Sequence, residues 1–273
     1  MDVYLLILAH AGAGSVERLV RRFDAPGFRI GIHVDAKSDA APFEALAARW
    51  PHVECIAPRV DHLWGDWTMV EIHLHALRHA ARHKDISHLV VLSADTEPLR
   101  STEAIRDFFA ARRGKSIVDG TPWQPEGRIS RHSHTYYSPF QRWLRRKGHE
   151  RLQYWTARLL PRPAATYRRF PQDWTVMFGR AWFALAREHW APLLAFCDAA
   201  DGPGARYFEG TIVPEEHVFQ TYLFNVVPEA VEPTRLVYAN YGPARPPLLD
   251  AAEIERLKDE TDFLFARKVA LIP

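Results

Sequence analysis

The sequence contains few cysteines. Its 273 residues include two, Cys55 and Cys197, which lie far apart in the chain. Two distant cysteines cannot build a disulfide framework or a zinc ribbon. A small secreted scaffold held together by disulfides is therefore excluded, and a reducing cytoplasm is the simplest setting for the protein.

The chain also lacks a strong excess of charge of either sign. It has 35 lysine and arginine residues against 33 aspartate and glutamate residues, a formal net charge of +2. A protein held to nucleic acid mainly by charge would be far more basic, so we do not expect a nucleic-acid partner. Only residues 120–170 are locally basic and aromatic, and they keep a nucleic-acid or membrane-surface patch open as an alternative.

No hydrophobic run is long enough to span a bilayer. The apolar segment Val3–Ala9 is too short, and it lacks the basic leader and the small-residue cleavage site of a signal peptide. We therefore expect a cytoplasmic protein, with peripheral association at the inner face of the membrane as the alternative.

Apolar and aromatic residues, by contrast, are plentiful. Hydrophobic residues make up 47% of the chain and nine residues are tryptophan, which is ample for a sizeable core and excludes wholesale disorder. No internal repeat or low-complexity tract divides the sequence. We predict one domain over residues 1–273, with composition shifts that separate the parts 1–119, 120–170 and 171–273.

The first part of the chain has the pattern of a βαβ unit. Val3–Ala9 is typical of a strand buried on both faces, Ser15 can cap the helix that follows, and a second strand, Arg29–Val34, ends at Asp35. In nucleotide-binding folds an acidic residue at this place contacts a ribose hydroxyl. The pattern predicts an α/β fold with a Rossmann-like, mostly parallel central sheet.

The turn after the first strand is rich in glycine. Gly12 and Gly14 supply part of a phosphate-binding turn, but Glu17 stands where the third glycine would be. Two interpretations remain open, a mononucleotide site at the strand ends and a nicotinamide-dependent oxidoreductase.

Acidic residues after another predicted strand form a second candidate site. His88–Ser93 is a buried strand, and Asp95 and Glu97 follow it. Ligands collect at the carboxyl ends of strands in open α/β sheets, so Asp35 and Asp95 are expected at one edge. Two hard oxygen ligands suit Mg²⁺ or Mn²⁺ on a nucleotide diphosphate. The alternative is a polar loop in which Asp95 caps the turn before Pro98.

Histidines form a row on a predicted helix, Thr68–His83. His75, His79 and His83 lie four residues apart, and the apolar residues of the helix are expected to face the sheet. Such a row can bind zinc, but no further ligand and no glutamate placed as a base accompany it. We therefore predict a solvated helix face.

The remaining elements are assigned from periodicity and turn residues. They are a strand at His52–Ala57, a helix at Thr102–Arg113, a strand at Ser116–Val118, a basic helix at Gln141–Leu160, a strand at Trp174–Phe178, a helix at Arg180–Phe196, a strand at Leu236–Tyr238 and a final helix ending at Phe265–Lys268. The middle, 120–170, lacks strong periodicity, as substrate-binding loops often do.

Two carboxylates stand where an extended segment turns into a helix. Pro214 suits the first helical position, so Glu215, Glu216 and His217 occupy the first turn. Acidic residues gather at helix starts because the backbone dipole favours them by roughly 0.3–1 kcal/mol. These residues alone leave open whether the pair serves the helix or the chemistry.

Seven stretches carry a resemblance to one enzyme family. They are Leu6–His10, Ile32–Ser38, Trp64–Glu71, Leu92–Leu99, Gly179–Glu188, Pro214–Thr221 and Leu264–Lys268. In this order they resemble the core-2/I-branching β-1,6-N-acetylglucosaminyltransferase family, which includes peptide O-xylosyltransferases. One stretch alone would be unspecific, whereas seven in order across nearly the whole chain are specific.

The resemblance implies a single GT-A-type glycosyltransferase domain. It implies inverting transfer of a sugar, GlcNAc or xylose-like, from a UDP-sugar to a hydroxyl of a glycan or glycoconjugate, with no metal required. Residues 1–119 would then form the nucleotide-binding lobe, 120–170 the variable loops, and 171–273 the acceptor and catalytic lobe. The implied partners are a nucleotide-sugar donor and a glycan acceptor.

The resemblance also implies roles for single residues. The second glutamate of the Pro-acid-Glu-His motif falls on Glu216, the candidate general base. Without a metal, the charge on the leaving diphosphate must be met by protein cations, and Arg245, Arg267 and Lys268 form the late basic cluster.

Other positions are expected to hold the substrates. Asp35, preceded by His33 and Val34, falls at the nucleoside contact. The residues expected to offer apolar faces to sugar rings are Trp182, Tyr238 and Tyr241.

The chain departs from the family pattern at Thr96. Members usually have an aspartate at this place, whereas here the acids flank it at Asp95 and Glu97. A metal-dependent transferase that binds Mg²⁺ or Mn²⁺ through these two acids therefore stays open. The other alternative is a non-catalytic glycan- or nucleotide-binding protein of the same fold.

Overall fold

The computed structural model describes residues 2–123, 143–144, 147–148, 173–197, 202–209, 211, 213–240 and 246–273. Most of the basic helix predicted at Gln141–Leu160 lies outside this part of the chain, as do Tyr241 and Arg245. Within the described ranges, no helix combines the length and apolar character needed to cross a bilayer.

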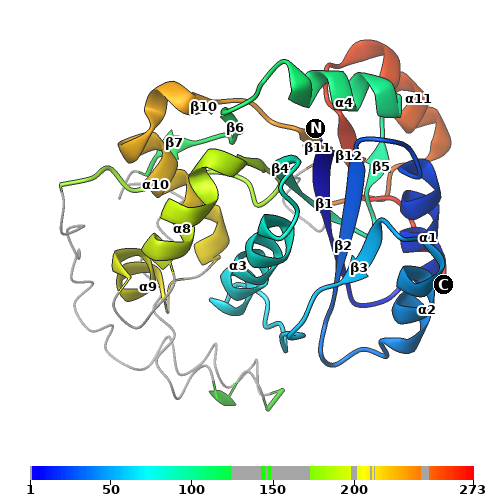
Figure 1. The fold of residues 1–273 in the computed structure, drawn as a ribbon, viewed down its shortest axis with the longest axis horizontal. Helices are drawn as coiled ribbons and strands as arrows, with labels where there is room; N and C mark the ends of the chain where they lie inside the picture. The colour runs from blue at the N-terminus through cyan, green and yellow to red at the C-terminus, as the bar shows by residue number, and fades with distance from the viewer. Residues whose placement is uncertain are drawn as a thin grey trace.

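Strands and helices alternate through the first part of the chain (Figure 1). The strands are β1 Asp2–Ala9, β2 Phe28–Val34, β3 Val53–Cys55, β4 Ile86–Ser93, β5 Glu97–Pro98, β6 Ser116–Ile117, β7 Thr121–Pro122, β8 Met177–Phe178, β9 Ala184–Ala186, β10 Val231–Glu232, β11 Val237–Ala239 and β12 Phe265–Arg267. The α-helices are α1 Ala13–Arg22, α2 Ala41–Arg49, α3 Thr68–Ala81, α4 Thr102–Ala110, α8 Trp190–Cys197, α9 Pro203–Phe208, α10 Val218–Val226 and α11 Ala251–Glu260. Short 3₁₀ turns are η1 Arg187–His189, η2 Pro214–Glu216 and η3 Pro228–Ala230.

The central sheet has the strand order β10-β6-β9-β4-β1-β2-β3. Strands β4, β1, β2 and β3 are parallel, whereas β9 is antiparallel to both β4 and β6. Two antiparallel pairings in succession restore the direction, so β6 and its parallel neighbour β10 run the same way as β4. The carboxyl ends of all strands except β9 therefore lie at one edge, where open α/β sheets bind ligands. The prediction of a mostly parallel α/β sheet is confirmed.

Strand β1 lies at the centre of two hydrophobic layers. Val3, Leu5 and Ile7 pack with residues of α1 and α2, whereas Tyr4 and Leu6 pack with residues of α3 and α8. Figure 1 shows these helix pairs on opposite faces of the sheet. A strand covered on both faces needs apolar residues throughout, which explains the unbroken hydrophobic run in the sequence.

A second, smaller sheet has the order β11-β12-β5. The prediction that Phe265–Lys268 ends a helix is wrong, because α11 stops at Glu260 and Phe265–Arg267 is a strand paired with β11 and β5. The backbone of Thr261 is extended and ends the helix. Phe265 and Ala266 are fully buried, so tertiary packing sets the conformation of this segment.

The helix predicted at Arg180–Phe196 is also wrong in its first half. Ala184–Ala186 is strand β9, inserted between β4 and β6, and α8 begins only at Trp190. All three residues of β9 are fully buried. A short apolar strand buried on both faces shows no polar alternation, so it resembles a buried helix in sequence.

The histidine row on α3 does not form the solvated face that we expected. His79 is 5% exposed, and its ring nitrogens lie 3.2 Å from Glu54 Oε2 and 2.9 Å from the carbonyl oxygen of Ala57. His83 Nε2 lies 3.3 Å from Glu54 Oε1. His79 and His83 instead contact β3 or the turn after it, and no group of three or more metal-binding side chains occurs among the described residues.

The glycine turn before α1 contacts the C-terminal segment. The Gly14 amide donates to the carbonyl oxygen of Pro273 at 2.8 Å, and Ser15 Oγ accepts from the Ile272 amide at 2.7 Å. Ser15 is therefore not the helix cap we predicted; the cap position is Gly12, with φ +74°. In this structure the predicted phosphate turn binds the chain's own backbone, which removes the main sequence feature of a dinucleotide site.

Candidate active site

Acidic residues follow three strand ends at the carboxyl edge of the sheet. Asp35 follows β2, Asp95 follows β4, and Asp119 lies two residues after β6. The first two were predicted at a shared edge from the sequence. Asp119 was missed, although the same signal, an acid directly after a buried strand, marks it.

Asp35 is 8% exposed, and its carboxylate is bound by Lys37. Its Oδ1 accepts from the Lys37 amide at 2.9 Å and lies 3.0 Å from Lys37 Nζ. Burial raises the pKa of Asp35, but the hydrogen bonds and charge of Lys37 outweigh it and hold this pKa below its usual range. Asp35 is therefore an ionised group at a fixed position.

The residues before Asp35 form a buried wall. His33 Nε2 accepts from the Val60 amide at 3.1 Å, and burial lowers the pKa of His33 to about 4, so the ring is neutral at pH 7. The guanidinium of Arg59 donates to the carbonyl oxygens of Val34 and Asp35 at 3.3 and 2.8 Å. The three residues predicted at the nucleoside contact thus lie together on one rigid strand end.

Asp95 pairs with two cations, Arg267 of β12 and Lys268 directly after it. Arg267 Nη2 lies 3.1 Å from both carboxylate oxygens of Asp95, and Lys268 Nζ lies 3.6 Å from Oδ2. Burial raises the pKa of Asp95, but Arg267 foremost among its partners brings it below the usual range. Arg267 is 9% exposed whereas Lys268 is partly exposed, so Lys268 is the better placed of the two to touch a ligand.

The two acids of the proposed metal clamp have different partners. Asp95 pairs with β12, whereas Glu97 forms an ion pair with Arg18 of α1. Between them, Thr96 is fully buried and its hydroxyl accepts from the Ser93 amide at 3.2 Å. At the position where the family pattern has an acid, this chain thus has a residue that closes a turn.

The predicted helix start at Pro214 is a 3₁₀ turn, η2, followed by α10. Glu215 is 5% exposed, and burial together with the neighbouring charge of Glu216 raises its pKa to about 8. Glu216 is partly exposed. Burial raises the pKa of Glu216 to about 7, with Arg180 opposing the rise and Asp119 adding to it. Burial thus outweighs the effect of the helix start on both carboxyl groups.

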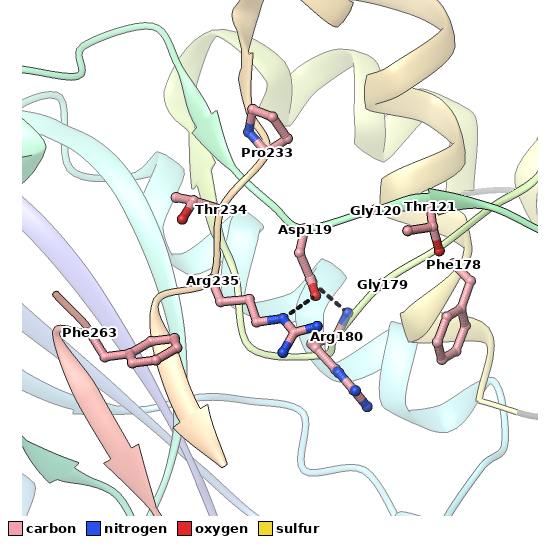
Figure 2. Close-up of a pocket in the computed structure, with 10 residues that line it drawn as sticks. All are labelled: Asp119, Gly120, Thr121, Phe178, Gly179, Arg180, Pro233, Thr234, Arg235 and Phe263. Carbon is pink, nitrogen blue, oxygen red and sulfur yellow. Dashed lines mark hydrogen bonds and ion pairs between the residues drawn. The ribbon is translucent and has the colours of Figure 1, made fainter. Parts of the chain in front are cut away.

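A pocket of about 580 Å³ lies next to the turn that carries Glu216, and Figure 2 shows the residues that line it, of which Glu216 is not one. It is lined by Asp119, Gly120, Thr121, Phe178, Gly179, Arg180, Pro233, Thr234, Arg235 and Phe263. The Gly179 amide donates to the backbone oxygen of Glu216 at 2.9 Å. The pocket is therefore in direct contact with the turn that carries the candidate base, and its size is typical of a small-molecule site.

Asp119 links segments that line this pocket through hydrogen bonds. Its Oδ1 accepts from the Arg180 amide at 2.7 Å and its Oδ2 accepts from Arg235 Nε at 3.1 Å, as Figure 2 shows. A side chain at Gly179 would place its Cβ 2.0 Å from the Asp119 carbonyl oxygen, so only glycine fits there. Three segments, after β6, before β9 and after β10, meet at this one carboxylate.

The loop before β9 connects the pocket to the Asp95 cluster. Two residues after Arg180, the Trp182 ring lies under the Arg267 guanidinium, whose central carbon is 4.0 Å from the ring centroid. One face of Trp182 is thus covered by a cation–π contact, and the ring also packs on both core layers. Its predicted contact with a sugar stays a prediction.

Tyr238 lies near the same pocket. Its ring packs edge-on against the pocket residue Phe263, with centroids 5.7 Å apart. Its predicted sugar contact also stays a prediction, and the matching expectations for Tyr241 and Arg245 fall outside the described residues. The pocket residues Arg180 and Arg235 were not predicted; Arg180 lies in the recognised stretch Gly179–Glu188, but Arg235 has no signal in the sequence.

Comparisons with known proteins bear on what this edge of the sheet does. The family described as Core-2/I-Branching enzyme matches residues 3–245. The chain is also similar to Xylosyltransferase oxt of Drosophila pseudoobscura pseudoobscura, at 23% identity over 231 residues, which cover 81% of this chain and 24% of that protein. The chain thus spans about a quarter of the length of this curated relative.

Proposed function

Because the chain belongs to the Core-2/I-Branching enzyme family, we propose that it is an inverting glycosyltransferase that moves a sugar from a UDP-sugar to a hydroxyl of a glycan or glycoconjugate. The observation that carries the proposal is Glu216, a partly exposed residue whose carboxyl has a raised pKa and interacts with Arg180 and Asp119, two residues that line a pocket of about 580 Å³. A GlcNAc or xylose-like sugar is proposed for the donor, the second because the relative is a xylosyltransferase.

In the proposed reaction Glu216 acts as the general base. Its carboxylate accepts the proton of the acceptor hydroxyl while that oxygen bonds to the anomeric carbon, and the bond from this carbon to the UDP oxygen breaks on the opposite face. The pKa of about 7 leaves a large ionised fraction at neutral pH and makes the carboxylate a stronger base than an ordinary glutamate. Configuration at the anomeric carbon is inverted in this single step.

The leaving diphosphate needs positive charge on its departing oxygens. We propose that Lys268 provides it, with Arg267 and Asp95 fixing its position. Asp35, next to Lys37 at the end of β2, is proposed to contact the nucleoside. All these groups lie at the carboxyl edge of the sheet, where the fold class binds nucleotides.

We propose that no metal ion is required. Asp95 and Glu97, the two acids that could hold one, are each paired with a cationic side chain from a different element. A divalent ion would have to displace Arg267 from Asp95 and Arg18 from Glu97. The positive charge that a metal would supply is present in Arg267 and Lys268.

The test is the variant Glu216→Gln, measured as transfer of sugar from UDP-sugars to glycan acceptors. Loss of a general base is expected to lower kcat by roughly 10²–10⁴-fold while UDP binding is kept. The matched control is Glu229→Gln, an exposed acid on η3, which should leave the rate unchanged. Transfer by Glu216→Gln at the wild-type rate would show that the base is assigned wrongly.

A further inference from the structure

Two arginines and one acid supply the charge that lines this pocket. Within the described residues, the charged side chains of the lining are those of Arg180, Arg235 and Asp119. Glu216, which is not part of the lining, interacts with the same groups, since Arg180 lowers its pKa and Asp119 raises it. The feature that would recognise an anion is therefore the placement of the guanidinium groups and not a net charge of the pocket.

The single acid of the pocket is engaged in holding it together. Asp119 accepts from the Arg180 backbone and from Arg235 Nε, at 2.7 and 3.1 Å, and its side chain is 18% exposed. Each of its oxygens therefore accepts a hydrogen bond from within the protein. The residue acts as the anchor for both arginines.

Arg235 can offer a bidentate contact. Its side chain is 55% exposed and uses Nε for Asp119, and within the described residues no other hydrogen bond of its guanidinium is seen. The two terminal nitrogens carry N–H groups in a planar fork that matches the two oxygens of a carboxylate. Figure 2 shows the side chains of Arg180 and Arg235 on the same side of the pocket.

Apolar surface accompanies these charges. Phe178 and Phe263 lie at opposite ends of the pocket in Figure 2, with the arginines between them. Aromatic rings contact the C–H faces of sugars. A site for a small inorganic anion would gain nothing from contact with two aromatic rings. The combination of arginines and aromatic rings therefore favours a sugar that carries a negative charge.

The position of the pocket decides which substrate it serves. A general base must reach the acceptor hydroxyl, and the backbone of Glu216 contacts the pocket residue Gly179, while its carboxyl interacts with Arg180 and Asp119 of the lining. The pocket is therefore assigned to the acceptor, whereas the nucleotide groups proposed above are Asp35 and Lys268. We propose that this pocket is an acceptor subsite for a carboxylated sugar, such as a hexuronate, with Arg235 and Arg180 contacting the carboxylate. The inference rests on the proposed glycosyl transfer, since only a transferase has an acceptor.

The test compares two probes that differ in charge, D-glucuronate and D-glucose, bound to the whole chain and followed by ligand-observed NMR. A charged hydrogen bond supports an expected preference of roughly tenfold or more for glucuronate. Arg235→Gln should abolish most of this preference, and Arg235→Lys, which keeps the charge, should retain part of it. The control Arg106→Gln removes a charge from the exposed face of α4 and should change nothing.

Inorganic phosphate and UDP complete the experiment. Phosphate should displace bound glucuronate only weakly, because phosphate lacks the sugar ring that the phenylalanines contact. Equal binding of glucuronate and glucose, a preference that survives Arg235→Gln, or phosphate as the best competitor would each overturn the inference. UDP binding separates the two proposals: UDP bound without a glucuronate preference leaves the transferase proposal standing and removes only this subsite.

Discussion

Single residues at the carboxyl edge of the sheet are tuned by burial more than by secondary structure. The start of α10 would lower the pKa of a nearby carboxyl, yet burial raises the pKa of Glu216 to about 7 and that of Glu215 to about 8. Both groups therefore change charge within the pH range in which an enzyme works. This difference gives each residue its own measurable pH signature.

The rate should depend on the ionisation of Glu216. A general base must be deprotonated, so kcat/KM is expected to fall about tenfold for each unit of pH below about 7 and to level off above it. Arg180 lowers the pKa of Glu216, so Arg180→Gln should move the midpoint to higher pH. The measurement is a pH–rate profile for both proteins, and a flat profile from pH 5.5 to 8 would contradict the assignment.

Stability should depend on Glu215. Its pKa is near 4.5 in the unfolded chain and about 8 in the folded protein, so the folded state binds more protons between these values. The contribution of Glu215 to the free energy of unfolding should therefore be most favourable below pH 4.5, and it should become less favourable as the pH rises toward about 8.

Removing the titrating group gives the matched comparison. Glu215→Gln keeps the shape of a protonated carboxyl but cannot ionise. The difference between the Tm of this variant and the Tm of the wild type should therefore increase steadily in favour of the variant between pH 5 and 8. Thermal unfolding across this range measures the difference. Parallel Tm curves for the two proteins would mean that Glu215 does not hold its proton on folding.

At the level of single residues, motifs decided which positions were predicted. Asp35, Glu216 and Lys268 lie in recognised stretches, and their roles stay predictions. Arg235 was not found, because its position depends on Asp119, 116 residues earlier in the chain. Pairing of this kind leaves no trace in local periodicity.

Among the elements, the two strands that were predicted as parts of helices share a cause, whereas helices α2 and α9 were not predicted at all. Strands β9 and β12 are three residues long and fully or nearly fully buried, and both were predicted as parts of helices. Short apolar segments carry too little pattern to show their period, so their neighbours decide their conformation. Longer elements such as β1, β4 and α4 were predicted within a few residues of their observed bounds.

The segment that joins β8 to β9 depends on a glycine. At Gly179 a Cβ would lie 2.0 Å from the backbone oxygen of Asp119, so Gly179→Ala should push the loop away from Glu216 and lower both Tm and transfer rate. Gly120→Ala is the graded control, since its Cβ would meet the movable ring of Phe224 at 2.5 Å.

The order of the two variants is the informative result. Thermal unfolding should show a larger loss for Gly179→Ala than for Gly120→Ala, because a backbone neighbour cannot turn aside as a ring can. Wild-type Tm and rate in Gly179→Ala would show that the loop has room to move and that the tight contact is not needed.

At the scale of the whole molecule, the order of motifs predicted more than any single pattern did. The mostly parallel α/β sheet and membership of the Core-2/I-Branching enzyme family are both confirmed. The division into lobes and the roles of the middle residues, 120–170, stay predictions. The segment lacks strong periodicity, and most of the one helix predicted in it, Gln141–Leu160, lies outside the described residues.

Ligand binding to the whole protein tests the metal and nucleotide assignments together. UDP at about 100 times its Kd should stabilise the folded state by about 2.7 kcal/mol and raise Tm, since it binds only the native protein. The rise should persist after exhaustive treatment with EDTA. A UDP-induced rise that disappears on chelation and returns with Mn²⁺ would favour a metal at Asp95 and Glu97 instead.

The pairing of Asp95 with Arg267 joins groups that are 172 positions apart in the chain. During synthesis the carboxylate leaves the ribosome long before the two cations that it orients. The proposed diphosphate site therefore has no existence as a local unit of the chain: it forms only when β12 pairs with β11 and β5.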